Sequence, residues 1–189
     1  MIVYILEYRT LFDFLEWTIA MIKGQDVLVA IKLLDPWEQS MLSLGTQIGV
    51  SASQAHSSFL RLCAVGLVDQ QRRATQRAHF LEFLVHAIKY MFPVSLVAQN
   101  QGIPTAHSAP PVKQKLVAPK GAPVYVWPSK GGSLIAGIGV EPIYKTVPLV
   151  VRADARAYAI LAALDSIRLG KARERETAAQ VLEALVYGD

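Results

Sequence analysis

Side chains able to hydrogen-bond with base edges gather in one short segment of the chain. Serine, glutamine and histidine are short donors and acceptors that reach bases in a DNA major groove, and arginine pairs with guanine or with phosphate. On a helix over 52–65, with Ser51 directly before it, these side chains fall on or near the outward face. The set comprises Ser51, Ser53, Gln54, His56, Ser57 and Arg61. The pattern indicates a helix that reads DNA.

A basic stretch follows at a distance that suits a second contact with DNA. Between residues 61 and 77 the chain has four arginines against one acid, Asp69. Residues 70–75 are polar and basic, which is typical of a wing that touches phosphates or the minor groove beside a recognition helix. The arginines expected to hold the DNA backbone are Arg72, Arg73 and Arg77.

The histidines and the cysteine favour no metal or redox site. His79, Glu82 and His86 have the spacing of one helix face, which suits a metal, but a third strong ligand is not obvious. Cys63 lies among apolar residues and is expected to be a core thiol, because a redox sensor needs an exposed, activated thiolate. We therefore expect no metal.

Nucleophilic catalysis is not favoured either. His107 and Ser108 are adjacent, but no acid lies nearby in the sequence and no Gly-x-Ser-x-Gly motif is present. The glycines at 131–132 and 137–139 are too incomplete for a phosphate-binding loop. The expectation is a protein that is not an enzyme and that needs no cofactor.

The residues around the predicted reading helix fit a helix-turn-helix. Gly45 is small enough for two helices to cross closely, and Gly49 suits a turn that needs a positive φ angle. Val50 would fill the core beneath that turn. Ser51 and Gln54 have the spacing of a capping box at the start of the helix. The expected buried face of the helix is Ala55, Phe59 and Leu62.

Apolar spacing and helix-breaking residues divide the rest of the chain. Seven of the ten prolines fall between residues 93 and 128, so that stretch is expected to be ordered loop with short strands at most. The predicted helices are 2–22, 27–34, 38–48, 52–65, 76–91, 154–168 and 172–187, and the predicted strands are 67–69, 124–127 and 137–140. The last two helices are expected to bury Leu161, Leu164, Ile167, Val181, Leu182 and Leu185.

The expected fold class is mainly α with a small β component. A winged helix-turn-helix is followed by a proline-rich segment of loops and short strands and then by a C-terminal helix pair. The N-terminal helix occupies 1–22, the winged helix-turn-helix 23–92, the proline-rich segment 93–148 and the C-terminal helical segment 149–189. Met21 would be a natural start for the winged helix, so residues 1–20 represent either an upstream start or an additional helix.

Composition and charge narrow the class of protein. Of the 189 residues, 52% are hydrophobic, which suffices for a packed core. Acidic and basic residues interrupt the most apolar stretch, 1–22, so neither a membrane span nor a signal peptide is expected there. The single cysteine favours a reducing, cytoplasmic setting. The net charge of +4 owes most to residues 94–148, where five lysines stand against one acid and have no assigned role.

Residues 24–91 together resemble the winged helix-turn-helix of bacterial transcriptional regulators of the MarR-like kind. The chain is also similar to a group of uncharacterised bacterial helix-turn-helix proteins. In these, a Gly-x-Pro-Thr-Ala-His-x-Ala-Pro-Pro stretch, here residues 102–111, and a helical C-terminus follow the winged helix. The resemblance implies a sequence-specific regulator that binds double-stranded DNA. A homodimer is expected, because one small module reads too few bases for specificity.

Two other functions stay open at this point. A helix-turn-helix also occurs in protein-interaction domains, and the proline-rich segment with the C-terminal helices would suit a regulatory or neutralising partner of a neighbouring gene product. A ligand-sensing regulator would need a pocket, which the sequence does not locate.

Overall fold

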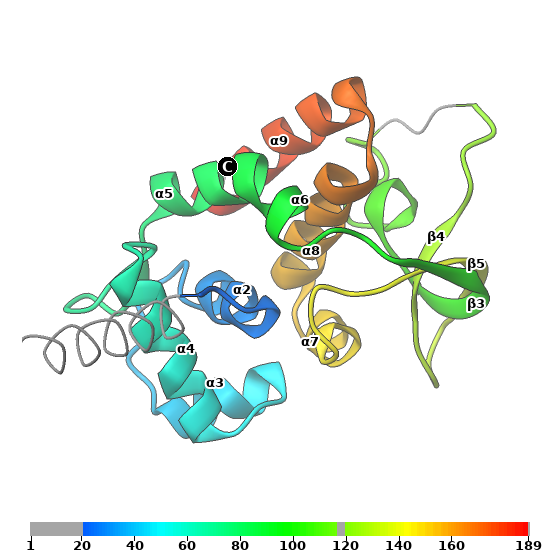
Figure 1. The fold of residues 1–189 in the computed structure, drawn as a ribbon. Helices are drawn as coiled ribbons and strands as arrows, with labels where there is room; N and C mark the ends of the chain where they lie inside the picture. Colours follow the sequence, from blue (N-terminus) through cyan, green and yellow to red (C-terminus); the bar gives the residue numbers. More distant parts are fainter. Residues whose placement is uncertain (1–20, 117–119, 189) are drawn as a thin grey trace, which may run out of the picture.

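The computed structural model describes residues 21–116 and 120–188 and shows a mainly helical chain with a small β component (Figure 1). This confirms the fold class that the sequence predicts. The predicted helix over 2–22 lies outside the described residues apart from Met21 and Ile22, which are not helical. In the described part of the chain, no helix is both long enough and apolar enough to cross a membrane.

The first part of the described chain contains the predicted helix-turn-helix and a short two-stranded sheet. The first helix begins at Gly24, before the predicted residue 27, because the Asp26 carboxylate accepts a hydrogen bond from the backbone of Lys23 and caps the helix early. The second begins after Ser40, whose hydroxyl accepts from the backbone of Ser43. These elements are α2 (Gly24–Lys32), α3 (Met41–Ile48), α4 (Ala52–Ala64), β1 (Val68–Asp69) and β2 (Ala74–Thr75).

The helix predicted over 76–91 is present, with one local departure from α geometry. It runs as α5 (Arg77–Glu82), the π-helical turn η1 (Phe83–Ala87) and α6 (Ile88–Met91). Leu84 in η1 and Ile88 in α6 are fully buried. The helix therefore connects the helix-turn-helix and two-stranded sheet before it (residues 24–75, the winged region) to the C-terminal half through apolar packing.

The proline-rich segment folds into more strand than the sequence predicts. It contains β3 (Leu96–Pro104), a 3-10 turn η2 (Ala106–Ser108), β4 (Tyr125–Pro128) and β5 (Ile135–Val140). β3 pairs antiparallel with β4 and β5, and β4 pairs parallel with β5, which closes a small three-stranded barrel. The expectation of only short strands is wrong for β3. Its single proline is its last residue, so every earlier backbone amide of the strand remains able to pair.

Three helices complete the chain. They are α7 (Val147–Ala153), α8 (Ala155–Leu169) and α9 (Ala172–Tyr187), of which α8 and α9 match the predicted pair. α7 is not among the predicted helices; Pro148 lies in its first turn, a position that proline tolerates well. Of the residues expected to be buried in α8 and α9, only Leu185 is not, being half-buried.

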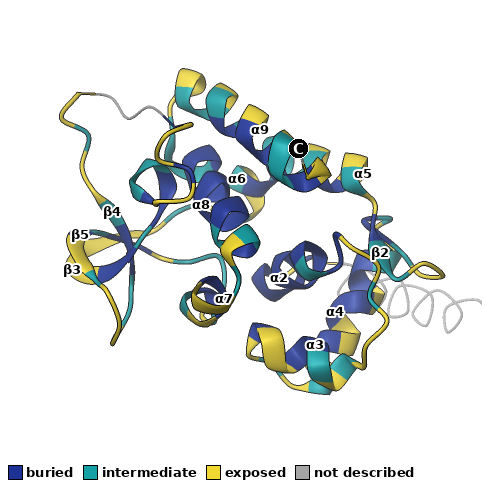
Figure 2. Ribbon diagram, turned by 180° about the vertical axis from the view of Figure 1, so that it is seen from behind, coloured by how far each residue is buried: buried dark blue, intermediate teal, exposed yellow. Residues whose placement is uncertain are grey.

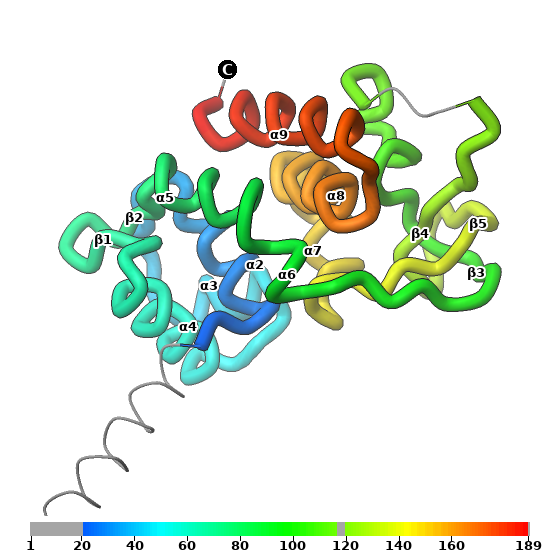
Figure 3. Tube along the Cα trace, turned by 45° about the horizontal axis from the view of Figure 1, so that its top comes forward, coloured from blue at the N-terminus to red at the C-terminus, as the bar shows by residue number. Residues whose placement is uncertain are grey.

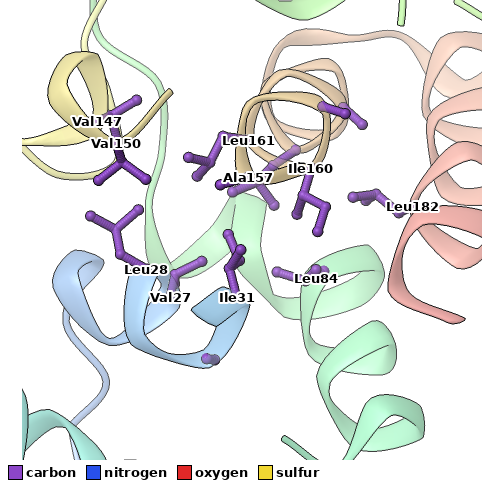
Figure 4. Close-up of a cluster of buried hydrophobic side chains, with 14 of the residues drawn as sticks. Val27, Leu28, Ile31, Leu84, Val147, Val150, Ala157, Ile160, Leu161 and Leu182 are labelled. Atoms are coloured by element: carbon purple, nitrogen blue, oxygen red, sulfur yellow. The ribbon is translucent and has the colours of Figure 1, made fainter. Parts of the chain in front are cut away.

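Helix α8 lies at the centre of the molecule and is buried along most of its length (Figures 2 and 3). One hydrophobic core extends from Ile22 to Val186. Figure 4 shows its middle, where α2 and η1 meet α7, α8 and α9. Val27, Leu28, Ile31, Leu84, Val147, Val150, Ala157, Ile160, Leu161 and Leu182 are all at most 2% exposed there except Ile31, at 5%. The winged region is thus packed directly onto the C-terminal helices.

A buried carboxylate on α8 joins the barrel to the helices. Asp165 is 2% exposed, and its Oδ2 accepts hydrogen bonds from the Thr105 hydroxyl at 2.8 Å and from Trp127 Nε1 at 2.7 Å. Its Oδ1 accepts from Arg168 at 2.6 Å. Burial raises the pKa of Asp165 above the ordinary aspartate value, while these three donors favour the ionised form and oppose that rise.

We expect Asp165→Asn to destabilise the fold strongly, because it leaves the Arg168 guanidinium buried without its counter-ion. The expected loss is about 3–5 kcal/mol in the free energy of unfolding. Urea unfolding followed by circular dichroism measures it. The exposed Glu176→Gln on α9 is the matched control and should stay within about 0.5 kcal/mol of the parent. Equal stability of the two variants would contradict the role given to Asp165.

A half-buried contact makes the stability of the fold depend on pH in the alkaline range. The Tyr158 hydroxyl donates to the carbonyl of Pro104 at 2.8 Å, and burial raises its pKa to about 12. An unfolded tyrosine titrates near pH 10, so between about pH 10 and 12 only the unfolded chain releases this proton. The contribution is complete below pH 10 and is lost as the pH rises. We expect a steeper fall in stability over this range in the parent than in Tyr158→Phe, whereas exposed Tyr90→Phe should retain the parental slope.

Candidate nucleic-acid interface

The geometry of the helix-turn-helix depends on two glycines, as predicted. A Cβ on Gly45 would lie 2.7 Å from the Val50 carbonyl oxygen, so only glycine permits this approach of α3 to the turn. Gly49 ends α3 with φ +73°, in the left-handed region that glycine adopts without strain. Val50 packs partly buried against the core below. The turn is therefore short and fixed.

The start of α4 carries the predicted capping box. The Ser51 hydroxyl accepts from the backbone of Gln54 at 3.2 Å, and the Gln54 side-chain oxygen accepts from the backbone of Ser51 at 3.0 Å. The buried face is also as predicted, with Ala55, Phe59 and Leu62 at most 6% exposed. Because the oxygen of Gln54 is engaged in the cap, its amide nitrogen is the atom left to donate outward.

The opposite face of α4 presents polar side chains to solvent, none of them Asp, Glu, Lys or Arg. Five of the predicted residues are exposed, namely Ser51, Ser53, Gln54, His56 and Ser57. Leu60, which the sequence analysis did not single out, continues this face and is 43% exposed. An apolar side chain at such a position suits contact with a thymine methyl group. The face is therefore equipped for hydrogen bonds and apolar contact, and no charged residue contributes to it.

The expectation that Arg61 lies on or near this outward face is wrong. Its guanidinium is buried and forms two hydrogen bonds with Asp26 of α2, from Nε at 2.8 Å and from Nη2 at 2.6 Å. Nη2 also donates to the Ser58 hydroxyl, which in turn accepts from Gln25. Arg61 therefore holds α4 against α2. The helix periodicity put it near the outward face, but its long side chain reaches inward to a buried acid.

The predicted wing is a tight loop between β1 and β2. Asp69 accepts hydrogen bonds from the backbones of Gln71 and Arg72, both at 2.9 Å, which closes the turn. Arg73 adopts φ +50° and donates to the carbonyl of Gln39 at 3.2 Å. Arg72 is exposed and Arg73 half-buried. Figure 3 shows this loop at the same end of the molecule as α4.

Arg77, expected to hold the DNA backbone, is instead engaged by other parts of the chain. Its guanidinium donates to the carbonyls of Val186 and Tyr187 at 2.9 and 2.8 Å, and to Leu34 and Asp35 at 3.0 Å. Four hydrogen bonds of this one side chain thus connect α5 to the last turn of α9 and to the residues just after α2. The side chain is structural, because both terminal nitrogens of its guanidinium already donate to acceptors within the chain and are not left for a phosphate.

The other chemically interesting residues have structural partners. His79 Nδ1 lies 3.0 Å from the Gly66 carbonyl oxygen, and His107 Nε2 lies 3.1 Å from the Pro123 carbonyl oxygen. Ser108 accepts from the backbone of Tyr125. Burial, with a smaller effect of Asp69, raises the pKa of the Cys63 thiol, which disfavours the thiolate. Within residues 21–116 and 120–188, no three potential His, Cys, Asp or Glu ligands form a metal-binding group.

No family model, no characterised protein and no solved structure matches the chain. The MarR-like resemblance therefore stays a prediction. What the structure itself defines is a helix-turn-helix followed by a short β1–β2 loop, a polar outward face on α4 without Lys, Arg, Asp or Glu, and an exposed arginine, Arg72, in that loop.

The new assignment of Arg61 leads to a stability prediction. We expect Arg61→Ala to lower the free energy of unfolding by about 3–5 kcal/mol, because it leaves Asp26 buried and unpaired. Arg72→Ala should change it by no more than about 0.5 kcal/mol, since that side chain is exposed. Chemical denaturation of both variants measures the difference. If Arg61→Ala is as stable as Arg72→Ala, the buried pair does not hold α4 in place.

Proposed function

We propose that this protein is a cytoplasmic, sequence-specific DNA-binding regulator that uses α4 as its recognition helix. The observation that carries the proposal is the combination of a rigid helix-turn-helix with an exposed row of short polar groups that begins at the helix N-terminus. That end of a recognition helix is the part that contacts base edges. In this reading Ser53, Gln54, His56 and Ser57 face the major groove, and Arg72 and Arg73 contact phosphates.

We expect the DNA-bound form to be a homodimer. One α4 spans too few base pairs for a specific site, and two copies would read half-sites about 34 Å apart. Of the last two helices, α8 is mostly buried within its own protomer. A dimer contact through these helices would therefore use the exposed face of α9. Size-exclusion chromatography with light scattering, with and without a selected DNA site, measures the stoichiometry.

Because only Arg72 and Arg73 are proposed to contact phosphates, we expect the affinity for DNA to depend only weakly on salt concentration. Each phosphate contact contributes a slope of about −0.9 to log K against log salt. Arg72 and Arg73 therefore predict a slope of about −2 per protomer. Fluorescence anisotropy with DNA from upstream of the gene, at several salt concentrations, measures it. Arg72→Ala should reduce the slope by about 1 per protomer and weaken binding to all sequences alike, whereas Lys115→Ala, outside the winged region, should leave it unchanged. A slope unaffected by Arg72→Ala would remove the wing from the interface.

Gln54 should instead determine which sequences are preferred. Replacing it with alanine removes the outward amide donor, and loss of one good base contact changes discrimination by about tenfold or more at a single base pair. Selection from a randomised oligonucleotide library, followed by sequencing, compares the variant with the parent. The control is Gln47→Ala, an exposed glutamine on α3. If Gln54→Ala keeps the parental preference and only weakens binding overall, Gln54 reads no base.

A second candidate function is that of a protein-interaction module. The observation that favours it is the barrel, where Leu96, Val97, Val124 and Ile135 are each more than 40% exposed. Exposed apolar side chains in one region are typical of a surface that meets another protein. Co-expression with the product of the neighbouring gene distinguishes the candidates. A stoichiometric complex without DNA affinity favours the interaction module, and specific DNA binding by the isolated chain favours the regulator.

A further inference from the structure

A cavity lies between the barrel and the corner where α8 meets α9, away from the winged region. Its volume is about 340 Å³, which is large enough for a small organic molecule. One wall comes from the loops around η2 and β4, and the other comes from the end of α8 and the first turns of α9. The residues that matter for its chemistry are His107, Lys120, Tyr125, Leu169, Lys171 and Thr177.

The wall on the barrel side is held in place by internal contacts. His107 Nε2 lies 3.1 Å from the Pro123 carbonyl oxygen, and the His107 and Tyr125 rings meet edge to face with centroids 5.5 Å apart. The preceding Ala106 adopts φ +49°, an uncommon conformation for a residue with a side chain. Thr105, directly before it, is anchored to the buried Asp165. These contacts hold the part of the wall formed by Ala106, His107, Pro123 and Tyr125 in place.

The interior of the cavity is mainly apolar. Leu116 and Leu169 contribute aliphatic surface, and Tyr125 contributes an aromatic ring that is half-buried. Pro123 and Ala122 complete the apolar part of the lining. Such walls suit the carbon skeleton of a ligand, with polar groups required only where the ligand carries them.

The edge of the cavity is positively charged. Lys120 and Lys171 both line it and are both exposed. The one acid in the lining, Glu174, already accepts a hydrogen bond from the backbone of Lys171 at 2.6 Å, as part of the cap of α9. No carboxylate in the described part of the chain forms an ion pair with the Lys171 ammonium group. The positive end of the α9 dipole adds to the same field.

We propose that this cavity binds a small organic anion. The ligand places an acidic head group, a carboxylate, sulfonate or phosphate, between Lys120 and Lys171. Its apolar body lies against Tyr125, Leu116 and Leu169. The proposal gives a role to part of the lysine excess in the proline-rich segment. It rests on the cavity alone and stands or falls independently of DNA binding.

The test uses two fluorescent probes that differ in one charged group, 8-anilinonaphthalene-1-sulfonate and uncharged N-phenyl-1-naphthylamine. Both become bright in apolar surroundings, but only the first carries an anionic head. We expect saturable binding of the sulfonate with one site per chain and weaker binding of the neutral probe. Lys171→Gln should weaken sulfonate binding about fivefold, since a partly exposed charge contact contributes about 1 kcal/mol, and should leave the neutral probe unaffected.

A cavity-filling variant gives an independent measurement. Thr177→Phe places a ring in the cavity and should abolish saturable binding of the sulfonate. Its matched control is Gln180→Phe, an exposed position on the same helix outside this cavity, and Lys115→Gln is the charge control. Circular dichroism verifies that each variant is folded. Sulfonate binding that is equal in Lys171→Gln and in the parent, or that persists in a folded Thr177→Phe, overturns the proposal. If Thr177→Phe does not fold, the Lys171→Gln comparison decides by itself.

Discussion

The hydrogen-bonded carboxylate of Asp165 is the contact on which the C-terminal half of the molecule depends. Its three donors come from the end of β3, from β4 and from the next turn of α8. Arg168 extends the connection, since it also donates to the carbonyls of Phe92, just after α6, and Glu141, just after β5. A barrel of only three strands has little apolar interior of its own. Asp165 and Arg168 therefore supply the fixed points that attach it to the helices.

The other end of α8 attaches the winged region. Lys32 at the end of α2 pairs with Asp154, which caps α8, and Arg156 of α8 pairs with Asp35. Arg77 shares Asp35 and reaches the last carbonyls of α9. The buried side chains of α2, η1, α8 and α9 fill the space between these polar ties. Because apolar packing and charged contacts act together at this junction, the helix-turn-helix that contains α4 is packed onto the rest of the chain rather than joined by a flexible linker.

The sequence predicted the features that depend on neighbouring residues. The capping box at Ser51, the left-handed Gly49 and the buried face of α4 all follow from rules that act within one helical turn or one tight turn. The partners of the arginines do not follow from such local rules. Arg61 binds an acid 35 residues away, and Arg77 binds carbonyls 109 and 110 residues away. Such partners are brought together only by the tertiary fold, and no periodicity in the sequence encodes them.

The same limit applies to β3 and to the cavity. β3 pairs with strands that follow it by some tens of residues, and prolines nearby obscured its pattern. The cavity is shared between the loops around η2 and the α8–α9 corner, so no single segment reveals it. By contrast, the stretch 102–111 stands out in the sequence, but the role of Thr105 within it is visible only through its hydrogen bond to Asp165.

The distribution of charge determines how this protein would have to recognise DNA. Two of the four arginines expected at the interface serve the fold instead, and a third, Arg73, has part of its hydrogen-bonding capacity engaged with Gln39. The outward face of α4 carries no Lys, Arg, Asp or Glu. A protein with so few phosphate contacts gains little from nonspecific attraction, which normally supplies most of the affinity for random DNA. In the proposed function, its affinity for a site would therefore have to come from base contacts, and from duplicating them in a dimer. The absence of Lys and Arg from the outward face of α4 would then favour discrimination between sequences over tight binding to any duplex.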